Sequence, residues 1–431
     1  MVVVLTIERV LAWEALDSRG KPTVACAITL DGGGEGQAIV PSGASTGTHE
    51  AHERRDGGPR LGGAGVRTAV AAVNGEIADA LRGREAADQG VIDAVLRDLD
   101  GTPTLERLGA NAVLAASVAS ALAAANGRAQ PLWRSLAQQG PPLLPLPMVN
   151  ILSGGAHAGG LVDLQDVLVV PVGATSFGEA IEWAARVRAG TAEVLRARGH
   201  DVRLVADEGG LAAPLRSNRE AVAVVAEGID HSGLVLGDEA AIAIDVAATQ
   251  LGDGNVYRLE CEQRSLHAAE LVDELRSWCN EFPIVSIEDG LGEDDIAGWK
   301  LAGDRLGELQ LLGDDLFVTS VDRLASGIAN GLANAVLVKP NQVGTLSDAR
   351  RVIDLARSAG YATVLSARSG ETEDAWLADL AVGWRTEQLK VGSTTRSERT
   401  AKWNRLLRLE AEHPDALFAG RTALDRGGSS R

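Results

Sequence analysis

The chain has 431 residues, 45% hydrophobic and 23% charged, so it is long enough for two folded domains and too rich in core-forming residues for a mostly disordered protein. Its net charge of −18 argues against nucleic acid or an anionic membrane as the main partner. The three cysteines match no zinc-binding spacing, and no stretch of about 20 apolar residues suggests a membrane span. We therefore expect a cytoplasmic protein.

The first 140 residues predict an α+β domain. Two segments of alternating polarity, 23–30 and 36–40, flank the glycine-rich segment 31–35, which is typical of a β-hairpin. Segment 105–129 is rich in alanine and leucine at helical spacing and predicts long packed helices. Four prolines between positions 141 and 147 then end any helix. We place a domain boundary there, between domains 1–140 and 141–431.

The second domain repeats one pattern, in which a short apolar run ends in a polar residue and is followed by a loop and an amphipathic helix. The apolar runs are 203–206, 241–244, 283–287, 309–313, 335–338, 362–366 and 387–389. From Glu288 onward the polar residues lie 22 to 29 residues apart. One strand and one crossover helix occupy about 30 residues or somewhat fewer, so the pattern predicts an α/β fold with a (β/α) barrel.

In such a barrel, the polar residues at the ends of the strands meet at one mouth, because the carboxyl ends of parallel strands converge there. These residues are Glu208, Asp245, Glu288, Asp314, Lys339, Arg368 and Lys390. The alternative is that each is a separate, solvated charge at the end of a strand. Seven such charges at successive ends favour a shared site.

This group of charges indicates a chemistry. Three carboxylates without cysteine or histidine suit Mg²⁺. Lys339, beside that ion and the ammonium of Lys390, is expected to lose basicity and to act as a base. Mg²⁺ on a substrate carboxylate stabilises an enediolate, so the predicted step is removal of the proton α to a carboxylate. Glu208 can protonate a departing group from the other side, which gives a β-elimination.

The sequence resembles the enolase family over nearly its whole length. The motifs that carry the resemblance are segments 17–24, 41–47, 154–159, 207–210, 286–290, 313–315 and 368–374. The resemblance implies an enolase-type (β/α)8-like barrel as the C-terminal domain and an α+β capping domain at the N-terminus. Segment 41–47 corresponds to the mobile lid of the family.

The resemblance also implies roles for individual residues. Asp245, Glu288 and Asp314 correspond to ligands of a first, conformational Mg²⁺, and Ser45 to a ligand of a second, catalytic one. Lys339 is the base and Glu208 the acid. The residues that face the substrate are Lys390, Arg368, Ser369, Gln165 and His157. The substrate is then a small phosphorylated acid of the 2-phosphoglycerate or phosphoenolpyruvate type, and the protein a homodimer. Two alternatives stay open: Ser45 as an ordinary loop serine and His157 as a structural histidine.

Two positions near the leaving group depart from the family pattern. Ala367 stands where the family carries histidine, and Asp166 where it carries glutamate; Lys21 and Pro340 also differ, without an effect that we can assign. The loss of an imidazole predicts a wider space over the far carbon of the substrate. We therefore expect a specialised member such as a carboxyphosphonoenolpyruvate synthase of phosphonate biosynthesis, with CMP-activated phosphonoformate as second reactant. The alternatives are ordinary phosphopyruvate hydratase, drift in a redundant paralogue, and an inactive binding protein.

Overall fold

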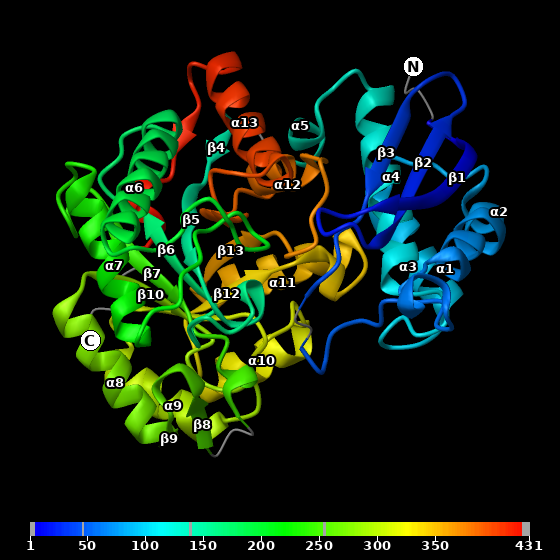
Figure 1. The fold of residues 1–431 in the computed structure, drawn as a ribbon. Coiled ribbons are helices and arrows are strands. Elements are labelled where there is room, and N and C mark those ends of the chain that lie inside the picture. Colours follow the sequence, from blue (N-terminus) through cyan, green and yellow to red (C-terminus); the bar gives the residue numbers. More distant parts are fainter. Residues whose placement is uncertain (1–4, 45–46, 138–139, 253–255, 425–431) are drawn as a thin grey trace.

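The structure, a computed structural model, describes residues 5–44, 47–137, 140–252 and 256–424, which form two parts that lie side by side (Figure 1). The first part contains an antiparallel sheet in the order β1 (Ile7–Leu16), β2 (Pro22–Leu30) and β3 (Glu35–Ile39). The turn between β2 and β3 holds three consecutive glycines with positive φ, Gly32 to Gly34. Glycine adopts these angles without strain, and the predicted hairpin is confirmed.

Helices cover one face of this sheet. The helices of this part are α1 (Arg67–Ala72), α2 (Ala78–Leu81), α3 (Gln89–Asp100), α4 (Ala110–Gly127) and α5 (Leu132–Leu136). Helices α1, α2 and α4 contact the sheet, α3 packs on α4, and α5 packs mainly on α12 (Trp376–Trp384) of the second part. Helix α4 packs directly on β2 and β3, and it confirms the helix predicted within 105–129. The approach is so close that a Cβ atom at Gly36 would lie 2.1 Å from the Ala123 nitrogen. Among the described residues, α4 is also the one helix long and apolar enough to cross a membrane, and 83% of it is buried inside the protein.

The second part is a closed barrel of eight strands. In barrel order they are β10 (Ile284–Glu288), β11 (Gln310–Gly313), β12 (Ala335–Val338), β13 (Ala362–Ser366), β14 (Gln388–Lys390), β5 (Leu146–Ser153), β6 (Asp166–Val170) and β7 (Ala241–Asp245). Strand β6 runs antiparallel to both of its neighbours, and the other pairs are parallel. The barrel confirms the predicted fold class, and six of the seven predicted strands belong to it.

The strand predicted at residues 203–206 is wrong. Residues 203–206 form no ladder and make only an isolated bridge between Val205 and Leu211. The reason is that β6 pairs directly with β7, so a closed barrel leaves no free edge for this segment. The side chain of Leu204 is accordingly 72% exposed. The repeated pattern also failed to predict β5 and β6, because the sequences of these two strands differ from those of the later strands.

An outer layer of helices surrounds the barrel. Its members are α6 (Phe177–Ala197), α7 (Asn218–His231), α8 (Ala268–Glu281), α9 (Ile296–Leu306), α10 (Val321–Asn330), α11 (Leu346–Ser358), α12 (Trp376–Trp384) and α13 (Ser397–Glu412). Several begin at a serine or threonine whose side chain accepts a hydrogen bond from the third helical N–H, as Ser176, Ser217 and Thr345 do. Such caps satisfy N–H groups that the helix itself leaves unpaired, and they fix where each helix starts.

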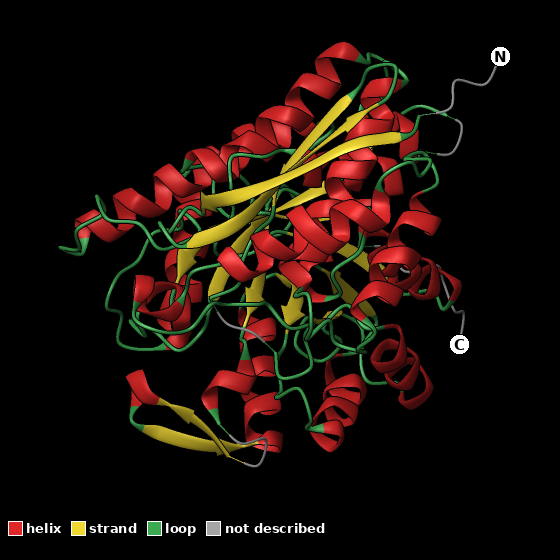
Figure 2. Cartoon of the chain, turned by 90° about the vertical axis from the view of Figure 1, so that its right-hand side faces the viewer, coloured by secondary structure: helices red, strands yellow, loops and turns green. Residues whose placement is uncertain are grey.

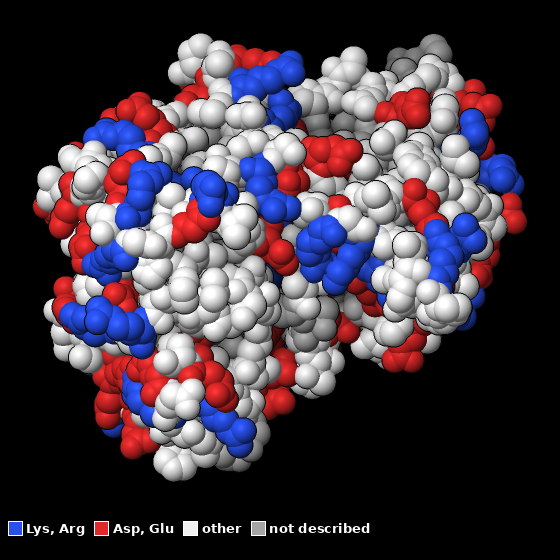
Figure 3. All heavy atoms as spheres, viewed as in Figure 1, with Lys and Arg blue, Asp and Glu red and all other residues white. Residues whose placement is uncertain are grey.

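Two small sheets complete the structure. Strand β4 (Leu143–Leu144) pairs with β15 (Leu417–Phe418), and β8 (Val256–Leu259) pairs with β9 (Arg264–His267) as a hairpin at the lower edge of the molecule (Figures 1 and 2). On the face seen in Figure 3, acidic and basic side chains are mixed, without one continuous basic patch.

Buried polar contacts join the two parts. The carboxylate of Asp93 on α3 accepts from the Ser347 N–H at 2.8 Å, and Asp374 accepts from the Ile39 N–H at 2.7 Å. Ser42 and Gly370 exchange two backbone hydrogen bonds of 2.9 Å. The beginning of the predicted lid, at Ser42, is therefore attached to the barrel loop that follows β13. The domain boundary near residue 140 stays a prediction.

Candidate active site

Three of the predicted metal ligands lie on neighbouring barrel strands. Asp245 ends β7 and Glu288 ends β10, and these two residues are register partners in the barrel. Asp314 directly follows β11. Lys390, at the end of β14, reaches across the mouth and places its Nζ 2.8 Å from both Asp245 Oδ2 and Glu288 Oε2. All four are buried. The barrel thus brings together side chains that are up to 145 residues apart.

Lys339 follows β12 and forms an ion pair with Asp314. Burial alone lowers the pKa of the Lys339 ammonium, but Asp314 opposes this effect and the net pKa is raised. The predicted loss of basicity is therefore not achieved by the residues of the protein. It requires a further positive charge near the lysine or neutralisation of Asp314.

The chemistry of the acidic group fits a hard cation. Burial raises the pKa of Glu288 well above its usual range, and the carboxylate of Asp245 raises it further. Glu288 Oε1 is buried and has no hydrogen-bond partner among the described residues. A cation would satisfy this oxygen, and an all-oxygen set of donors suits Mg²⁺. However, among the described residues the three predicted ligands do not place oxygens within 4.8 Å of one another, whereas Asp289, Asp314 and Asp315 do.

Asp289, which was not among the predicted residues, supports the positions of Asp314 and Asp315. Its backbone has a positive φ of 42°, and its carboxylate accepts from the N–H groups of Asp314 at 2.9 Å and Asp315 at 2.7 Å. Burial and the nearby Asp315 raise its pKa well above the usual range. Asp289 therefore fixes the loop that presents Asp314. Its position next to Glu288 was the available signal.

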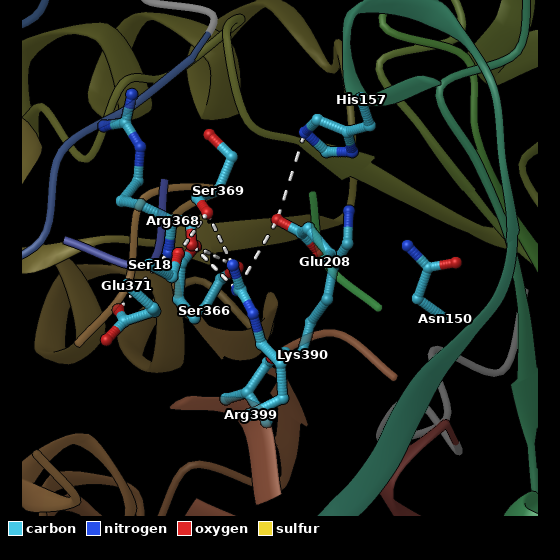
Figure 4. Close-up of polar contacts among 12 residues, drawn as sticks. Ser18, Asn150, His157, Glu208, Ser366, Arg368, Ser369, Glu371, Lys390 and Arg399 are labelled. Carbon is cyan, nitrogen blue, oxygen red and sulfur yellow. Dashed lines mark hydrogen bonds and ion pairs between the residues drawn. The ribbon is translucent and has the colours of Figure 1, made fainter. Parts of the chain in front are cut away.

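His157 lies between two carboxylates. It is held on a short 3₁₀ turn, Gly155–Ala158, with its Nδ1 2.9 Å from Asp166 Oδ2. Its Nε2 lies 3.9 Å from Glu208 Oε1 (Figure 4). Burial lowers the pKa of the imidazole, but the two acids more than offset this and raise it to about 9. The structure therefore brings His157, Asp166 and Glu208 together, as a second cluster beside the lysines.

Glu208 lies on a turn and not at the end of a strand. Figure 4 shows its carboxylate between His157 and Arg399, whose Nη1 is 3.8 Å from Glu208 Oε1. Burial favours the neutral acid, yet His157 and then Arg399 hold the pKa of Glu208 at about 2. The predicted proton donor is thus ionised in this state. Arg399 is fully buried on α13, and no pattern in the sequence distinguished it.

The two predicted phosphate contacts face the predicted lid. Arg368 Nη1 lies 2.8 Å from Glu50 Oε2, and Ser369 Oγ accepts from the Ala44 N–H at 2.6 Å. Arg399 holds the same loop from below, because it donates to the carbonyl oxygens of Arg368 and Ser369 at 2.8 and 2.6 Å (Figure 4). Glu50, like Arg399, was not predicted. Ser45 lies outside the described residues.

The remaining predicted residues are also at the mouth. Gln165 donates to Asp245 Oδ2 at 3.1 Å and accepts from Gln250 at 3.0 Å. Ala367 is only 4% exposed, and its N–H donates to the Lys390 carbonyl oxygen at 2.9 Å. The surrounding residues enclose the methyl group, and the wider space over the substrate stays a prediction.

Comparisons with known proteins agree with this geometry. The family model "Enolase, N-terminal domain" matches residues 7–136, and "Enolase, C-terminal TIM barrel domain" matches residues 141–426. A relative from Sulfurimonas denitrificans, named enolase, is 48% identical over 407 residues, which cover 94% of this chain and 96% of the relative. The chain belongs to the enolase family.

Proposed function

We propose that the protein dehydrates 2-phosphoglycerate to phosphoenolpyruvate, through an enolate stabilised by Mg²⁺. The observation that carries the proposal is the pairing of two lysines, the partly buried Lys339 and the buried Lys390, with three buried carboxylates at one mouth of a closed barrel. The match over 94% of the chain to a relative named enolase supports the same reaction.

Asp245, Glu288 and Asp314 are the proposed ligands of one Mg²⁺, and Ser45 of a second. Bound Mg²⁺ supplies positive charge that stabilises the enediolate and lowers the basicity of a neighbouring lysine. Lys390 forms ion pairs with Asp245 and Glu288, so it is placed to face the carboxylate of a substrate at the same site.

Lys339 is the proposed base that removes the C2 proton. Arg368 and Ser369 are the proposed phosphate ligands. A phosphate at Arg368 has to compete with Glu50, so binding of the substrate is expected to loosen the contact between Glu50 and the barrel. Glu208 is the group proposed to face the hydroxyl that leaves from C3.

A second candidate reaction is the specialised synthase, in which an enolate of the same type meets CMP-activated phosphonoformate. Ala367 and Asp166 are the observation that favours it, because loss of an imidazole and retraction of a carboxylate weaken a hydratase. The relative named enolase favours the hydratase instead. A homodimer, a cytoplasmic location and the absence of nucleic-acid or membrane partners remain predictions.

One experiment separates the two candidates. The purified protein is incubated with Mg²⁺ and 2-phosphoglycerate, and phosphoenolpyruvate is followed by its ultraviolet absorbance. Turnover within the usual enzyme range of about 1–10³ s⁻¹ supports the hydratase. Much slower turnover, together with a new phosphorus NMR signal when CMP-phosphonoformate is added, supports the synthase. If neither product forms and calorimetry detects no joint binding of Mg²⁺ and 2-phosphoglycerate, both proposals fail.

A further inference from the structure

The carboxylate of Asp166 is fully buried and is hydrogen-bonded by three side chains. Its Oδ1 accepts from Asn150 Nδ2 and, at 2.8 Å, from Ser153 Oγ, and its Oδ2 lies 2.9 Å from His157 Nδ1. Asn150 and Ser153 lie on β5, and Asp166 begins the adjacent strand β6. Two strands of the barrel wall therefore hold this carboxylate rigidly, with one oxygen directed at the histidine.

These contacts fix the orientation of the imidazole. With Nδ1 directed at Asp166, the ring presents Nε2 to Glu208 Oε1. A backbone contact also links the segments that carry His157 and Glu208, because the His157 carbonyl oxygen accepts from the N–H of Asp207, next to Glu208, at 3.2 Å. A ring nitrogen that donates to a carboxylate determines the tautomer and the direction of the other nitrogen.

The charges around the pair place a proton on the histidine. Asp166, Glu208 and Asp245 are the acids that act on His157, and they raise its pKa to about 9 despite burial. Glu208 faces His157, Arg399, Lys390 and Lys339, and these cations keep its pKa at about 2. Glu208 alone therefore holds no proton to give to a leaving group near neutral pH.

We propose that Asp166, anchored by Asn150 and Ser153, is a positioning residue that holds His157 as the proton source for Glu208 in the elimination step. This inference rests on the proposed function. The Nε2 proton moves to Glu208 and on to the hydroxyl oxygen at C3 as the C3–O bond breaks. The electron pair left at C2 forms the C2=C3 double bond, water departs, and neutral His157 regains a proton from solvent.

The departures from the family pattern agree with this role. Aspartate is one methylene shorter than the glutamate expected at position 166, and its carboxylate is engaged by Asn150, Ser153 and His157. Position 367 carries a methyl group in place of an imidazole. His157 is thus the imidazole beside Glu208, with Nε2 3.9 Å from Oε1, and Asp166 orients its ring.

The test separates the two halves of the reaction. In D₂O with Mg²⁺ and 2-phosphoglycerate, exchange of the C2 hydrogen reports proton removal, and formation of phosphoenolpyruvate reports elimination. We expect Asp166→Asn to lower elimination about 10²-fold, the lower end for loss of general acid catalysis, and to change exchange by less than about 3-fold. The matched control is Asp163→Asn, a buried acid near the same loop that contacts Asn218 and Cys261 instead. Any loss in the control is expected to affect both rates equally.

An equal loss of both rates in Asp166→Asn, or no loss, overturns the inference. A second measurement needs neither metal nor substrate. Nitrogen NMR at about pH 7.5, with the signal assigned by comparison with His157→Gln, is expected to show His157 protonated on both nitrogens in the wild type and neutral in Asp166→Asn. A neutral ring in the wild type contradicts the inference. If the wild type catalyses no C2 exchange, the proposed function fails, while the state of His157 is still measured.

Discussion

Lys339 is the residue on which the chemistry depends most. Its ammonium is partly buried and paired with Asp314, so removal of the lysine takes away the proposed base and leaves the carboxylate of Asp314 without its cation. We expect Lys339→Ala to lower exchange of the C2 hydrogen by at least 10²–10⁴-fold. The control is Lys300→Ala, because Lys300 is exposed on the outer helix α9. Equal exchange by the two variants, measured by proton NMR, contradicts the assignment.

Substitutions at positions 166 and 367 test how the departures from the family pattern affect the rate of dehydration. The double variant Ala367→His with Asp166→Glu restores both side chains that the family pattern expects, and we predict that it raises the rate of dehydration. Asp166→Glu alone is expected to lower that rate, since the longer side chain displaces His157 from its present contact. The two effects are not additive, because the residues act on one proton transfer. No gain in the double variant means that these two positions do not limit the hydratase.

At the scale of elements, the packing of α4 on β3 makes a sharp prediction. A methyl group at position 36 collides with the backbone of Ala119 and Ala123, which cannot move aside as a side chain can. We expect Gly36→Ala to lower the free energy of unfolding by about 3 kcal/mol. In contrast, a Cβ atom at Gly75 meets nothing within 4 Å. Gly75→Ala is the control, and it is expected to raise stability by about 0.5–1 kcal/mol in urea denaturation. Equal stability of the two variants means that the contact is looser than described.

The link between β3 and the loop after β13 is sensitive to pH. Burial raises the pKa of Asp374 from 3.8 to about 6, while its carboxylate accepts from the Ile39 N–H. The folded protein therefore binds this proton more tightly than the unfolded chain. The resulting stabilisation is complete below about pH 4 and is lost as the pH rises through 6.

Asp374→Asn removes the partly buried charge and keeps an oxygen for the same hydrogen bond. We expect the variant to be more stable than the wild type at pH 7.5, by up to about 2 kcal/mol, with the difference vanishing near pH 4. Urea denaturation at the two pH values measures it. A variant that is less stable than the wild type at pH 7.5 shows that the charged carboxylate is favourable in the folded protein.

At the scale of the whole molecule, the sequence predicted the barrel because most of its strands are short apolar runs that end in a charge. It also predicted which charges meet, since the carboxyl ends of parallel strands converge. It failed for Glu208, because the apolar run before that residue looks like a strand although the closed barrel offers it no partner. It also failed to find Asn150, Asp289 and Arg399, whose roles arise from contacts between distant segments and not from local patterns.

Contacts between distant segments also explain why the predicted loss of basicity of Lys339 is not found. The residues next to Lys339 in the sequence do not predict its contact with Asp314. The two side chains are close because β11 and β12 are neighbours in the barrel. The pKa of the lysine is therefore set by the assembled mouth.

A crystal structure with Mg²⁺ and 2-phosphoglycerate tests whether the mouth of the barrel holds the metal and the substrate as proposed. We predict that carboxylate oxygens of Asp245, Glu288 and Asp314 coordinate one ion at about 2.0–2.1 Å, and that Lys339 Nζ lies about 3–3.5 Å from C2 of the ligand. An ion bound by other residues, or a ligand whose C2 is far from Lys339, contradicts it.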